Sequence, residues 1–246
     1  MIIGFHYHIP AVRVEGRILT PGYQARFLEG LADNCERVIC FLHAPRAGQE
    51  GVACSPVERK NVELVPIGRS ASLPFRLLRA SRYTRRAQKR FGECDVLLLR
   101  GPSPLLPAFS NAARGIPQAL LIVGSYVDGV RTIARPRWQR KLVRLVVLRN
   151  QKRQDRIASG SLVFVNSRRL FCYYQQRNAI VYETRTTTLR KGDVCRRGDT
   201  CRGSGVQLLY SGRFDRAKGV FDLLEAASLL VSRGRDVNVA FMGWDE

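Results

Sequence analysis

The most constraining feature of the sequence is the stretch 206–243, in which two short apolar runs flank one amphipathic helix. The first run ends at Tyr210, and a polar turn that contains glycines and basic residues follows it. The helix begins at Gly219 and repeats its leucine, valine and alanine residues at helical spacing, and the second run ends at Met242. Strand, turn, helix and strand in this order predict a βαβ unit of a parallel sheet.

The turn of this unit combines glycines with basic side chains, namely Gly212, Arg213, Lys218 and Gly219. Such side chains stand beyond the carboxyl end of a strand and beside the start of a helix. Backbone N–H groups and the positive end of the helix dipole meet there, so the place suits a phosphate-bearing ligand. An ordinary βαβ turn with solvated basic residues is the alternative interpretation.

The spacing Gly-Arg-x4-Lys-Gly, followed by Leu-Leu-x-Ala, resembles the start of the second domain of GT-B-fold glycosyltransferases, and most closely the large retaining family called family 4. In that family the matching Arg and Lys contact the donor's diphosphate. The resemblance therefore implies a catalytic and donor-binding role for Arg213 and Lys218. It also implies that Gly212 and Gly219 allow close backbone approach to the donor. The activity implied is that of a hexosyltransferase with a nucleotide-sugar donor, without a metal or other cofactor.

In that family the second domain continues for several more βα units. We therefore expect a truncated or split enzyme, with little or no transferase activity from this chain alone. Residues 1–182 would form the acceptor-side Rossmann-like domain, the polar stretch 183–205 a linker, and 206–246 the incomplete nucleotide-sugar-binding domain. A second polypeptide could complete the donor domain.

Apolar runs and helical patterns alternate along the first 182 residues, which predicts an α/β fold with a doubly wound, Rossmann-like and GT-B-like N-terminal domain. The expected strands are 1–5, 38–42, 62–67, 95–99, 117–123 and 162–165, and the expected helices are about 22–33, 74–91, 104–114, 136–158 and 168–176. A glycine-bearing loop is expected from His6 through Gly22.

Ligands of open α/β sheets bind beyond the carboxyl ends of the strands, which selects three loops of the first domain. By resemblance, Gly16 in the first loop would lie near the donor phosphates, with Tyr23 on the acceptor side. Arg100 leaves a buried strand and could hold an anionic acceptor group. Ser125 and Asp128 stand where many family members place His or Asp near the sugar, so the resemblance implies a catalytic role for Asp128 and acceptor binding by Ser125. Surface-loop roles are the alternative for each of these residues.

Composition excludes several other classes of protein. The seven cysteines are odd in number and form no CxxC pair, which argues against a disulfide framework or a zinc site. The only histidines are His6, His8 and His43; without a third ligand at suitable spacing they are interpreted as hydrogen-bonding loop histidines. There is no apolar run of 18 residues and no signal-peptide pattern, so we expect a cytoplasmic protein.

The net charge of +21 favours anionic partners in general. Residues 136–149 form a basic amphipathic pattern with a Trp, which suits peripheral contact with an anionic inner-membrane surface. Packing of this helix on the sheet is the alternative. The leading hypothesis is sugar transfer from a nucleotide-sugar to a glycan or lipid-linked acceptor. A basic, non-catalytic module that binds nucleic acid or an anionic membrane is the competing one, although no nucleic-acid motif is present.

Overall fold

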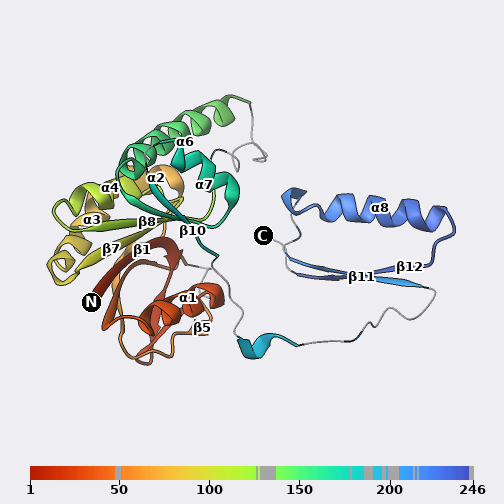
Figure 1. The fold of residues 1–246 in the computed structure, drawn as a ribbon, viewed down its shortest axis with the longest axis horizontal. Helices are drawn as coiled ribbons and strands as arrows, with labels where there is room; N and C mark the ends of the chain where they lie inside the picture. The colour runs from red at the N-terminus through yellow and green to blue at the C-terminus, as the bar shows by residue number, and fades with distance from the viewer. Residues whose placement is uncertain are drawn as a thin grey trace. The chain divides into compact units, whose positions relative to one another are not determined.

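The chain divides into two compact units, Met1–Leu189 and Arg190–Glu246, which are described separately. A computed structural model describes residues 1–47, 51, 53–125, 127, 137–177, 179–185, 191–195, 198, 205–212, 214 and 216–243. The ribbon of both units is drawn in Figure 1.

The first unit is built on a seven-stranded sheet in which every neighbouring pair of strands is parallel. The strands, in spatial order, are β10 (Ile180–Glu183), β9 (Leu162–Val165), β8 (Gln118–Ile122), β7 (Val96–Gly101), β1 (Ile2–Pro10), β4 (Arg37–Ala44) and β6 (Val62–Arg69). The chain builds outward from β1 in one direction and then from β7 in the other. This is the order of a Rossmann-like sheet, and it confirms the predicted α/β class and doubly wound first domain.

Two apolar cores cover the two faces of the sheet, because side chains alternate along each strand. One core contains Phe5, Leu28 and Cys40 and packs beneath α1 (Gly22–Ala32). The other contains Phe41 and Phe109 and packs beneath all the remaining helices except α2. The remaining helices are α2 (Leu73–Leu78), α3 (Ala80–Gln88), the short η2 (Phe91–Glu93), α4 (Leu106–Ala112), α6 (Arg137–Ala158) and α7 (Arg168–Gln175).

The helix expected over 74–91 is divided in two at Arg79, the last residue before α3. α2 buries none of its side chains, whereas α3 buries Tyr83, Thr84 and Ala87 against the sheet. The division therefore separates a turn that lies outside the core from the helix that packs on it. Among the described residues, no helix is long and apolar enough to cross a membrane.

The loop expected from His6 to Gly22 is largely regular structure. β1 continues to Pro10, and a small antiparallel sheet follows, made of β2 (Val12–Val14), β3 (Arg17–Thr20) and β5 (Ser55–Pro56). Glu15 and Gly16 form the hairpin turn with positive φ at both positions, 49° and 78°. Two-residue hairpin turns of this kind match the twist of the strands they join.

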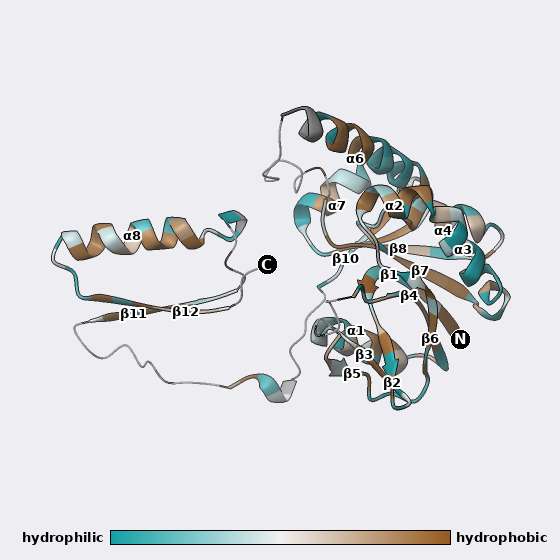
Figure 2. Cartoon of the chain, turned by 180° about the vertical axis from the view of Figure 1, so that it is seen from behind, coloured by the Kyte–Doolittle hydropathy of each residue, from teal (hydrophilic) through white to brown (hydrophobic). Residues whose placement is uncertain are grey.

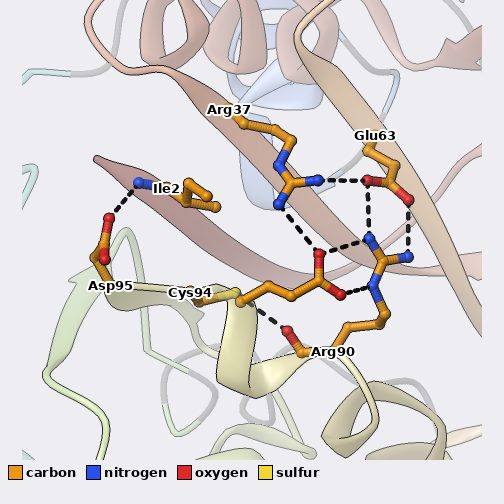
Figure 3. A network of polar contacts seen from close by, with 7 residues as sticks. Ile2, Arg37, Glu63, Arg90, Cys94 and Asp95 are labelled. Carbon is orange, nitrogen blue, oxygen red and sulfur yellow. Dashed lines mark hydrogen bonds and ion pairs between the residues drawn. The ribbon is translucent and has the colours of Figure 1, made fainter.

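Charged side chains at the amino ends of the strands are paired with one another (Figure 3). Arg90 donates from Nη1 and Nη2 to the two carboxylate oxygens of Glu63, at 2.8 and 3.0 Å, and it also pairs with Glu93. Arg37, the first residue of β4, donates to Glu93 Oε2 at 3.1 Å and lies 3.6 Å from Glu63. At the same edge the backbone N–H of Ile2 donates to Asp95. The amino edge of the sheet is thus held by compensated charges.

The second unit is the predicted βαβ unit. β11 (Val206–Ser211) and β12 (Val237–Met242) pair in parallel over six residues, and α8 (Val220–Ser232) connects them after the one-turn helix η4 (Arg216–Lys218). Another short helix, η3 (Lys191–Asp193), precedes β11 in the chain. In Figure 2 both strands are largely hydrophobic and α8 carries alternating hydrophobic and hydrophilic bands. The expected strand, turn, helix and strand are confirmed.

Candidate functional site

The strand order places a candidate site at the carboxyl ends of β1 and β7. In the first unit the chain order reverses between these two neighbours, and open α/β sheets bind ligands outside such a switch point. His6 on β1 pairs in register with Phe41 on β4 and with Leu99 on β7. His43 and Arg100 therefore follow close by on the flanking strands. Basic and imidazole side chains from three strands meet at this edge.

His6 is fully buried and connects neighbouring segments at the carboxyl edge of the sheet. Its Nδ1 lies 2.8 Å from the carbonyl oxygen of Phe41, which can only accept, so Nδ1 carries the proton. Its Nε2 lies 3.4 Å from the hydroxyl of Ser103, and its ring stacks on Phe109 at 3.8 Å. Its pKa is lowered to about 3, mainly by burial; the hydrogen bond to Phe41 opposes this shift, and the nearby His43, His8 and Arg76 add to it. His6 is neutral at pH 7 and joins β1 to β4 and to the loop after β7.

His43 and His8 each keep a buried ring nitrogen with no hydrogen-bond partner among the described residues, Nε2 in His43 and Nδ1 in His8. The other nitrogen of His43 lies 3.3 Å from the carbonyl oxygen of Gly68. Burial lowers the pKa of His43 to about 4 and that of His8 to about 3. Arg76 is the next largest cause in both, and Arg100 also acts on His8. Both rings are neutral and lie in a positive potential.

Arg100 is a buried cation without a carboxylate among the charged groups that shift its pKa. Its side chain is 7% exposed, and its Nε and Nη1 have no hydrogen-bond partner in the described part of the chain. The guanidinium carbon lies 4.7 Å from the ring centre of Tyr7 and 5.0 Å from that of Phe27. Burial lowers the pKa of Arg100, opposed by Tyr7 and Tyr23. The rings hold the guanidinium in place and leave two of its donors open.

Several residues predicted from the sequence meet at this edge. Arg100 and Tyr23 are close enough to shift each other's pKa; burial first, and then Tyr7, raise the pKa of Tyr23, while Arg100 lowers it. Ser125 is half-buried three residues after β8, the neighbour of β7. Asp128 lies outside the described residues.

Gly16 is placed elsewhere. It forms the exposed turn between β2 and β3 and borders a surface hollow of about 340 Å³ with Arg59, Lys60 and Val62, the first residue of β6. The structure therefore does not bring Gly16 together with Arg100 and Tyr23.

The donor-side residues lie in the second unit, at the carboxyl end of β11. Gly212 directly follows this strand, and its backbone N–H donates to the Met242 carbonyl oxygen at 3.0 Å. A Cβ at Gly243 would collide with the carbonyl oxygen of Gly212, so the two strand ends approach as closely as glycines permit. Lys218 is exposed and directly precedes Gly219, which has φ 73° at the start of α8. The predicted Arg213 lies outside the described residues.

The histidines are the functional candidates that sequence reasoning undervalued. His6 and His8 lie within β1 and not in a loop. Their alternation with Phe5 and Tyr7 was the available signal, because a period of two places the histidines on one face of a strand and the aromatics on the other. The described residues contain no group of three or more His, Cys, Asp or Glu side chains that could hold a metal ion.

Comparison with known proteins adds little to this geometry. No protein-family model and no curated protein matches the chain. One similar solved structure is described as a "putative UDP-N-acetylglucosamine 2-epimerase from Listeria monocytogenes", with 12% sequence identity and a TM-score of 0.45. The match covers 98% of this chain and 62% of that one, so this chain spans less than two thirds of its length. A similarity this low carries no argument about the function of the chain.

Proposed function

We propose that the chain is part of a nucleotide-sugar-dependent glycosyltransferase of GT-B type. The observation that carries the proposal is the turn of the second unit, where Gly212, Lys218 and Gly219 gather between the end of β11 and the start of α8. Backbone N–H groups at a helix start and an exposed lysine are complementary to a diphosphate. In this proposal, Arg213 joins Lys218 in contacting the donor.

The chemistry proposed for this turn is electrostatic. When the nucleoside diphosphate leaves the anomeric carbon, negative charge grows on a phosphate oxygen. The ammonium of Lys218 and the guanidinium of Arg213 would stabilise that charge. Asp222, in the first turn of α8, already supplies a negative charge to the helix start. It would therefore oppose the diphosphate.

The first unit would supply the acceptor side. Arg100 and Tyr23 lie together at the switch point, and Ser125 follows the neighbouring strand β8. In the proposal these three residues bind a glycan or lipid-linked acceptor, and Asp128 accepts hydrogen bonds from sugar hydroxyls. Gly16 remains a proposed donor contact only through its family resemblance.

Calorimetric titration of the chain with UDP, GDP and ADP tests the donor site without requiring turnover. Lys218→Ala should weaken binding of the preferred nucleotide by roughly tenfold or more, equivalent to about 1–3 kcal/mol for a lost charged hydrogen bond. Asp222→Asn, four residues away on the same turn, should leave binding equal or tighter. Equal affinities of the original chain and Lys218→Ala would remove Lys218 from the donor site.

We also propose that the amino-terminal half of α6 contacts an anionic membrane surface. Leu142 is 57% exposed and Leu145 46%, and the neighbouring Lys141 and Arg144 are exposed as well. Farther along the helix, Val147 and Asn150 are buried against the first unit. Sedimentation with vesicles containing phosphatidylglycerol should retain the original chain and lose a Leu142→Ser, Leu145→Ser double variant. Equal sedimentation of the two would contradict the proposal.

A further inference from the structure

Arg100 and His8 stand on neighbouring strands of the sheet, β7 and β1, and each keeps unsatisfied polar atoms at the carboxyl edge. In Arg100 these are Nε and Nη1, and in His8 the buried Nδ1. A buried donor without a partner costs roughly 1–3 kcal/mol, and more when it belongs to a charged group. A ligand that accepts hydrogen bonds from Arg100 would remove this cost.

The charge around these atoms specifies the kind of ligand. The ionisable groups that act on His8 are Arg76, His43 and Arg100, and those that act on His43 are Arg76 and Arg46. None of these groups is a carboxylate. At the opposite edge of the same sheet, Arg37 and Arg90 are paired with glutamates. The positive potential at the carboxyl edge is therefore local, and does not follow merely from the high arginine content.

We propose that Arg100 forms an anion site for a phosphate group, and that this group belongs to the acceptor. A phosphate presents several acceptor oxygens, which suits a guanidinium with two open donors. The open Nδ1 of His8 is an acceptor, because the other ring nitrogen donates to the Pro102 carbonyl oxygen, so His8 is not a donor to the phosphate. Tyr7 and Phe27 keep the guanidinium fixed, so little side-chain freedom is lost when the anion binds. Naming the acceptor rests on the proposed function; binding of the phosphate itself does not.

Titration with inorganic phosphate and with glycerol 1-phosphate, followed by calorimetry, tests the site. Arg100→Met should raise the dissociation constant for glycerol 1-phosphate at least tenfold. Arg177→Met is the matched control, because Arg177 also lies over a tyrosine ring, that of Tyr173, and its Nη1 already donates to the Tyr173 carbonyl oxygen. Both Arg-to-Met variants remove one positive charge. Equal weakening by the two would show general attraction to a basic protein and overturn the site.

A second measurement needs no folded variant at Arg100. The Nε–H resonance of Arg100 should shift on addition of glycerol 1-phosphate and stay in place with glycerol. An unmoved resonance at saturation would overturn the proposal. Vesicles containing phosphatidic acid, compared with glycerol 1-phosphate, then separate a lipid source of the phosphate from a soluble one. Loss of UDP binding in Lys218→Ala concerns the other unit, so the two proposals can fail independently.

Discussion

The guanidinium carbon of Arg100 lies 4.7 Å from the centre of the Tyr7 ring, inside the first unit and with two nitrogens unpaired. Burying a charge costs free energy unless hydrogen bonds compensate it, and a cation over aromatic rings offsets only part of that cost. The site is therefore maintained at the expense of the stability of the empty protein, as functional sites often are.

Arg100→Met should accordingly raise the free energy of unfolding of the protein in phosphate-free buffer, by about 1 kcal/mol or more. Methionine fills a similar volume and has no unsatisfied donors. The measurement is urea unfolding followed by circular dichroism, with Arg177→Met as the control that should give no gain. A less stable Arg100→Met protein would mean that the open donors are satisfied in solution.

Acidification should destabilise the first unit through its buried histidines. His6, His8 and His43 have folded pKa values of about 3, 3 and 4, below the ordinary value of 6.5. The unfolded chain therefore binds more protons between these values, and stability is lost as the pH falls from 6.5 towards 4. Each histidine contributes up to about 1.4 kcal/mol per pH unit. His8→Gln should show a shallower decline of the unfolding free energy between pH 7 and 5; parallel declines would place His8 in contact with solvent.

Two glycines of the first unit should respond in opposite directions to alanine. Gly68 has φ 134°, and a Cβ there would lie 2.9 Å from the Tyr83 ring, so Gly68→Ala should cost on the order of 1–3 kcal/mol. Gly30 lies inside α1 with open space around it, so Gly30→Ala should add about 0.5–1 kcal/mol. Urea midpoints of the two variants, compared with the original chain, check both signs. A neutral Gly68→Ala would contradict the backbone conformation described for the end of β6.

The sequence predicted the elements that bury large apolar sets and missed those that do not. The long alternation of strands and helices specifies a doubly wound sheet because each strand buries both faces. β10 was not predicted, because it is a strand of only four residues at the sheet edge and its side chains Ile180 and Tyr182 are exposed. β2 and β3 were missed for a similar reason, and their turn at Glu15 and Gly16 has no strong sequence signal.

The sequence predicted individual residues of the candidate site, but it did not predict that they lie close together. Arg100 and Tyr23 were each selected because a strand or loop of an open sheet ends near them. Their meeting depends on β7 lying beside β1, and this neighbour relation joins residues almost a hundred positions apart. His8 was assigned to a loop because Pro10 and two histidines interrupt the apolar run of the first strand. Spatial strand order, which local patterns do not encode, completes the site.

The paired arginines at the amino edge of the sheet and the buried Arg100, with two open donors, at the carboxyl edge give the first unit a directional field along its strands. An anion that diffuses towards this unit would be attracted to the carboxyl edge before it makes any contact, and would arrive with its charged end leading. Such guidance acts on the encounter rate and fades within about 10 Å at 0.1 M salt. The glutamates that neutralise Arg37 and Arg90 lie at the opposite, amino edge of the sheet. They would contribute to recognition because they prevent those two arginines from attracting the same anion.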